Sequence, residues 1–167
     1  MKVTTCEIVS AYDGINKLKE TIGDNKKRAK GVQAIIWFAE ELNKLTGTEL
    51  AVQCGVVHGA FANGAKRFQQ IDILLVLKNN IDEGDAFDFI IDNMVAGIYM
   101  EIPILFYLDV IAPKTLDLAI KHPMPRFRQM QEGIVFYGRD VLRQEPSNVQ
   151  SFNRTLQTDS TAKYCNG

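Results

Sequence analysis

GAFANG, at residues 59–64, lies between two apolar runs and decides which fold this sequence predicts. The first run is VQCGVV at 52–57, and the second is IDILLVL at 71–77. Glycine at both ends of the central stretch suits a tight turn, because glycine adopts backbone angles that other residues avoid. The pattern therefore predicts a strand at 50–58, a glycine turn, and a second strand at 70–78.

Two polar residues at the start of the second strand are expected to project together. Side chains alternate between the faces of a strand, so Gln70 and Asp72 share one face. Ile71, Ile73 and Leu75 then share the opposite face, which we expect to be the core.

Apolar periodicity predicts the remaining elements. Helices are expected at 5–22, 32–42, 83–98, 114–121 and 126–132, and further strands at 101–112 and 134–137. Residues 24–30 read as a polar, basic link. Pro103 favours an edge position for the strand at 101–112 or a bulge at that end, because proline cannot donate a hydrogen bond to a neighbouring strand.

This layout resembles the nucleotidyltransferase superfamily, whose small single-domain members have the DNA polymerase beta-like fold. The family pattern is an apolar strand, Gly-Ser-x-x-x-Gly, a short gap, and Asp-x-Asp on the next strand. Gly59, Gly64 and Asp72 match it, whereas Ala60 replaces the serine and Gln70 replaces the first aspartate. The run QEGIVFYG at 131–138 resembles the end of these small members, so the resemblance covers about 30–140.

The resemblance implies an α/β (α+β) fold with a small mixed sheet, helices on one side and an added N-terminal helical pair. It divides the chain into a helical extension at 1–28, the nucleotidyltransferase-like domain at 29–143, and a polar tail at 144–167.

The resemblance also implies where a nucleotide and its metal ion would lie. Phosphates would meet the glycine turn, with two cations in the loop that follows. The residues concerned are Gly59, Ala60, Gly64, Lys66 and Arg67. A metal ion would be held by Asp72, with Gln70 beside it, and by a third acid. The strand expected at 101–112 offers two candidates for that acid, Glu101 and Asp109.

Two departures from the family pattern remove chemistry from this site. Ala60 lacks the hydroxyl that the family directs at phosphate, and Gln70 lacks the negative charge that magnesium ions require. Losing both predicts a protein that does not transfer nucleotides. His58, just before the turn, either contacts phosphate, acts as an acid or base, or is a packed residue with one satisfied nitrogen.

The composition limits the partners and the location. The net charge of the 167-residue chain is −1, so no overall field attracts nucleic acid or an anionic membrane. Its apolar runs are far too short to span a bilayer. Cys6, Cys54 and Cys165 are an odd number and lack metal-type spacing, which argues against both a disulfide framework and a zinc site. These features predict a cytoplasmic protein.

Three functions stay open. Positions 60 and 70 favour the first and third, taken together, over the second. The first is a degenerate domain that binds a nucleotide or a protein without catalysis and needs no cofactor. The second is an active enzyme that uses Mg²⁺ and a nucleoside triphosphate to attach a nucleoside monophosphate to a small molecule, protein or RNA. The third is an antitoxin-like regulatory partner.

One apolar stripe has no place in the minimal fold. It belongs to the helix at 5–22 and consists of Ile8, Tyr12, Ile15, Leu18 and Ile22. Such a stripe must either cap the core of its own chain or meet a homodimer or hetero-partner subunit.

Overall fold

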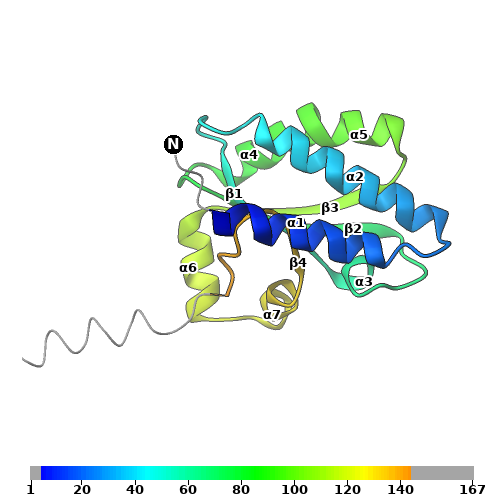
Figure 1. Cartoon of the computed structure of the whole chain (residues 1–167). Coiled ribbons are helices and arrows are strands. Elements are labelled where there is room, and N and C mark those ends of the chain that lie inside the picture. The colour runs from blue at the N-terminus through cyan, green and yellow to red at the C-terminus, as the bar shows by residue number, and fades with distance from the viewer. Residues whose placement is uncertain (1–4, 144–167) are drawn as a thin grey trace, which may run out of the picture.

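The computed structural model describes the backbone of residues 5–143 and the side chains of residues 13–143 (Figure 1). The elements, in chain order, are α1 (Thr5–Glu20), α2 (Lys26–Asn43), β1 (Val52–His58), α3 (Gly59–Ala62), β2 (Gln70–Leu77), α4 (Glu83–Ile90), η1 (Ile91–Val95), α5 (Ala96–Glu101), β3 (Leu105–Ile111), α6 (Pro113–Lys121), α7 (Pro125–Gln131) and β4 (Ile134–Gly138). Both strands around the glycine turn are therefore confirmed. The segment η1 is a π-helix that continues α4 into α5.

The four strands form one mixed sheet in the order β3-β2-β1-β4. β1 runs antiparallel to both β2 and β4, whereas β2 and β3 are parallel. The helices α4, η1 and α5 connect β2 to β3. They return the chain to the end of the sheet at which β2 began, so β3 runs parallel to β2. The predicted α+β class and the edge position of β3 are both confirmed.

Helices cover both faces of this sheet, so the expectation of helices on one side is wrong. On the first face, Ile71, Ile73 and Leu75 are fully buried under α1, α2, α4 and α5. On the second face, α6 and α7 supply Leu116 and Phe127 to a smaller core. Figure 1 shows these two helices on the opposite side of the sheet from α2 and α5.

The first helix belongs to the core of its own chain. Leu18 is fully buried, and Ile15 and Ile22 pack against the larger core. A Cβ atom on Gly14 would lie 1.7 Å from the carbonyl oxygen of Val135 in β4, so the helix backbone rests directly on that strand. Leu18 is thus not available to a second subunit, whereas Ile15 and Ile22 are only partly buried. The side chains of the stripe before residue 13 lie outside the described residues, and a subunit contact through residues 5–22 stays a prediction.

Two predicted boundaries were wrong for identifiable reasons. The polar link ends early, because Asn25 caps α2 by accepting a hydrogen bond from the Arg28 N–H at 3.1 Å. The strand expected from residue 101 starts only at Leu105, because α5 continues through Glu101. Pro103 disfavours helical angles at Ile102, which is extended at φ −125° and ends the helix there.

Within residues 5–143, no helix is long and apolar enough to cross a membrane. The predicted polar tail at 144–167 lies outside the described residues, and the division of the chain at residue 28 stays a prediction.

Candidate functional site

Four of the candidate residues, His58, Gln70, Asp72 and Asp109, lie on the second face of the sheet, the face that carries the smaller core. His58 ends β1 and is paired in register with Asp72 of β2. Asp72 is in turn paired with Tyr107 of β3. Paired residues project from the same face, so the sheet itself brings these three side chains together.

The glycine turn is built against the carboxylate of Asp72. Gly59 has φ +71° and Gly64 has φ +78°, both in the left-handed region that favours glycine. A Cβ atom on Gly59 would lie 2.7 Å from Asp72 Oδ2, so this position needs glycine for space as well as for its backbone angle. Ala60 follows on the exposed first turn of α3.

Gln70 and Asp72 share a face, as predicted, and they bind each other. Gln70 Nε2 donates a hydrogen bond to Asp72 Oδ1 at 2.8 Å. The amide therefore presents a donor to the carboxylate, whereas a second aspartate would present another acceptor to a shared cation. One oxygen of Asp72 is occupied by this bond, and the other lies against Gly59.

Of the two candidates for the third acid, only Asp109 lies on the sheet. It is paired in register with Leu74, one step further along the face that carries Asp72. Arg126 of α7 donates from Nη2 to Asp109 Oδ2 at 2.6 Å, so this carboxylate already has a cationic partner. Glu101 is the exposed last residue of α5, and its expected place on the strand is wrong.

Arg126 also joins the site to an exposed aromatic ring. Its guanidinium carbon lies 5.2 Å from the centroid of the Tyr107 ring. The Tyr107 hydroxyl and the Asp109 carboxylate together raise the pKa of Arg126. The guanidinium thus remains charged and spans Tyr107 and Asp109.

His58 is a packed histidine, but one of its nitrogens has no partner. Its side chain is 6% exposed, and Nε2 is buried without a hydrogen bond from any described residue. Burial lowers the pKa of His58, and the nearby charges of Asp72 and Asp109 only partly oppose this shift. The imidazole is therefore neutral at pH 7. The packed interpretation of His58 is confirmed, and Nε2 is the nitrogen without a partner.

The loop after the glycine turn carries the two predicted phosphate-binding cations. Lys66 and Arg67 are both exposed. Lys66 and Gly64 line a hollow of about 520 Å³ between this loop and residues 21–25, which link α1 to α2. Their role in binding phosphate stays a prediction.

Arg28 was missed by the sequence reasoning, and it holds this loop in place. The side chain is 1% exposed and donates to the carbonyl oxygens of Phe61, Ala65 and Thr21 at 2.7, 2.8 and 3.0 Å. The missed signal was its spacing, because Arg28 lies four residues before Val32, on the apolar stripe of α2.

The residues present do not fit the metal site that the resemblance implies. Asp72 is bonded to Gln70, and Asp109 is paired with Arg126. Among the described residues, no group of three or more His, Cys, Asp or Glu side chains could hold a metal ion. A hard divalent cation would first have to displace both of these partners.

Comparisons with known proteins add little to this geometry. No protein-family model matches the sequence, and no curated protein gives a significant match. Among solved structures, the chain is similar to the crystal structure of a mutant of the toxin–antitoxin MntA–HpeT, with a TM-score of 0.37 and 12% identity. That similarity covers 74% of this chain and 90% of the other. A TM-score this low supports no transfer of fold family, activity or partner.

Proposed function

We propose that this chain is a non-catalytic domain of nucleotidyltransferase-like layout that works as a protein-interaction module. The observation that carries this proposal is the hydrogen bond from Gln70 Nε2 to Asp72 Oδ1. This bond occupies one oxygen of Asp72, the single acid of the motif that the sequence retains, and the residue beside it, Gln70, carries no negative charge. Phosphoryl transfer depends on metal ions that neutralise developing charge, so this arrangement disfavours the reaction.

The pairing of Asp109 supports the same function. Two carboxylates on neighbouring strands could share a cation, but Arg126 already supplies a positive charge to one of them. The Asp109 side chain of this ion pair is only 29% exposed, and its Oδ2 lies 2.6 Å from Arg126 Nη2. We infer that the face stabilises the fold through internal pairs, and that any partner binds elsewhere on the domain.

Binding of a triphosphate and its turnover test this proposal directly. The full chain is titrated calorimetrically with each of the four common nucleoside triphosphates, with and without Mg²⁺, and then assayed for release of pyrophosphate. We expect neither Mg²⁺-dependent binding nor turnover. Turnover that disappears in the Asp72→Asn variant would refute the proposal and favour the active enzyme.

A repaired variant tests whether the loss of two side chains alone explains the absence of Mg²⁺ binding, or whether the whole site has been remodelled. The double change Ala60→Ser with Gln70→Asp restores the family pattern, and Ala60→Ser with Gln70→Asn is its uncharged control. Two carboxylates on one strand face repel each other, so the repaired protein should be less stable without a cation. Mg²⁺ should raise its melting temperature, because the ion binds only the folded state. Equal Mg²⁺ responses in both variants would contradict this explanation.

A further inference from the structure

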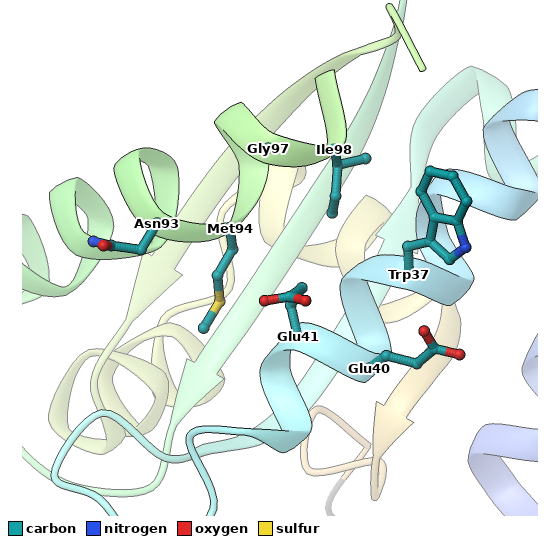
Figure 2. A pocket seen from close by; sticks show the side chains of 7 residues that line it. All are labelled: Trp37, Glu40, Glu41, Asn93, Met94, Gly97 and Ile98. Carbon is teal, nitrogen blue, oxygen red and sulfur yellow. The ribbon is translucent and has the colours of Figure 1, made fainter. Parts of the chain in front are cut away.

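A hollow of about 390 Å³ lies between α2 and the helical segment formed by η1 and α5. Its lining residues are Trp37, Glu40, Glu41, Asn93, Met94, Gly97 and Ile98. Figure 2 shows Met94 and Ile98 pointing toward α2, with the Glu41 carboxylate between the two helices and the Trp37 ring at one end. The hollow is on the opposite side of the sheet from Asp72, so it is independent of the candidate site.

The walls of this hollow suit a cation with an apolar stem. Met94 and Ile98 are 5% and 6% exposed and form an apolar floor, while Glu40 and Glu41 place carboxylates at the rim. Trp37 adds an aromatic ring, the best partner for a cation among the side chains. Lysine and arginine combine an apolar stem with a charged head, and so match both parts of the hollow.

The helical layer beside the hollow is strongly acidic. The three helical segments α4, η1 and α5 contain no lysine or arginine, whereas they contain five aspartate and glutamate residues. Asp85, Asp88 and Asp92 are exposed on α4 and η1. This layer is therefore locally negative in a chain whose net charge is only −1. Such a field attracts a basic partner.

Large apolar side chains flank the hollow along the same helical layer. Phe89 lies one turn before Asn93, whose side-chain amide donates to the Phe89 carbonyl oxygen at 2.8 Å. Met100 lies three residues after Gly97, which places it next to Gly97 on the helix surface. Phe89 is 39% exposed and Met100 is 81% exposed. A small polyamine would fill the hollow but leave these side chains in water, whereas a protein segment could cover both.

We propose that this acidic-aromatic face, made by Trp37, Glu40 and Glu41 of α2 with Phe89–Met100 of the following layer, docks a basic protein segment. One lysine or arginine of the partner enters the hollow beside Trp37, and apolar residues of the partner cover Phe89 and Met100. The exposed ion pair of Glu41 with Lys44 yields to the incoming cation, because such surface pairs contribute little. The inference rests on the proposed interaction function and names its surface and partner chemistry.

The single tryptophan of the chain lies in the hollow and reports its occupation. The full chain is titrated with a synthetic amphipathic peptide of leucine and lysine at helical spacing, and Trp37 emission is followed. A matched peptide with glutamate in place of lysine is the control. We expect saturable binding of the lysine peptide that weakens as salt rises, and no binding of the glutamate peptide.

Three variants locate the binding on this face. Gly97→Leu fills the mouth of the hollow, and a Cβ atom at Gly97 meets nothing within 4 Å, so the helix tolerates the change. Asp88→Lys with Asp92→Lys reverses two exposed charges of the layer. Both should weaken binding at least tenfold. Asp117→Lys changes an exposed charge on α6, on the other side of the sheet, and should leave the affinity unchanged.

Three outcomes would overturn the proposal. The first is equal binding of both peptides, and the second is equal weakening by Asp117→Lys. The third is light scattering that shows a dimer dissociated by Gly97→Leu, because the occupant would then be a second copy of this chain. Triphosphate turnover by the wild type would remove the proposed non-catalytic function but leave these titrations unaffected, so the two failures are distinguishable.

Discussion

Replacing Arg28 by methionine should lower the free energy of unfolding by about 3 kcal/mol, although the residue lies outside the strands and the glycine turn. The guanidinium links three parts of the chain that are distant in sequence. It donates to Thr21 before α2, to Phe61 in α3 and to Ala65 in the loop. It also lies 4.3 Å from the centroid of the Phe61 ring. No acidic partner within the described residues compensates its charge.

The magnitude follows from the bonds that methionine cannot make. The carbonyl oxygen of Phe61 loses its short, buried bond from the guanidinium and keeps only the longer bond from the Gly64 N–H at 3.2 Å, and this loss costs about 1–3 kcal/mol. The bonds to Thr21 and Ala65 are only partly buried, and water from the adjacent hollow can replace the guanidinium as the donor. The loss of each of these bonds therefore costs about 1 kcal/mol. Methionine no longer buries a charge, which offsets part of this loss; burial lowers the pKa of Arg28 for the same reason.

Urea denaturation followed by circular dichroism measures the change, and hydrogen exchange of residues 61–68 locates it. Lys30→Met is the matched control, because Lys30 is an exposed cation on the same helix. It should change stability by less than about 0.5 kcal/mol. Arg28→Lys should not rescue the fold, since an ammonium cannot reproduce the planar set of donors. A loss below about 1 kcal/mol for Arg28→Met, with unchanged exchange in the loop, would show that the clamp is dispensable.

Three further predictions concern other parts of the fold. In the same denaturation assay, Gly14→Ala should lower the free energy of unfolding by roughly 1–3 kcal/mol, because its Cβ atom would meet the Val135 carbonyl oxygen. Gly97→Ala should raise it by up to about 1 kcal/mol, because its Cβ atom meets nothing and alanine favours a helix. Burial raises the pKa of Cys54 to about 11, so its thiol should react slowly. In a Cys6→Ser, Cys165→Ser variant, a thiol reagent at pH 8 should label the native protein far more slowly than the urea-unfolded chain. Equal labelling rates would contradict the burial of Cys54. Burial lowers the pKa of His58 below 6.5, so the unfolded chain binds a proton that the folded protein does not, and stability should fall as the pH drops through 6.5; urea midpoints of His58→Phe should lack this component.

Local patterns were sufficient for the elements around the candidate site. Alternation of apolar residues in β2 placed Ile71, Ile73 and Leu75 in the core and put Gln70 with Asp72 on the other face. This worked because the two-residue period of a strand depends only on adjacent residues. The same reasoning failed for Glu101. Helix α5 continues through Glu101 and ends before Ile102, the residue that precedes Pro103, so β3 starts only at Leu105.

The sequence by itself determined the mixed α+β layout, the glycine turn and the face that carries Asp72, since each depends on residues close together in the chain. Only the tertiary structure decided which distant groups the polar side chains bind. Asp109 meets Arg126 from a helix seventeen residues away, and Arg28 meets the Phe61 carbonyl across thirty-three residues. These pairings depend on how the helices pack on the sheet. A sequence pattern shows which face a side chain takes, but not which distant group packing brings to it.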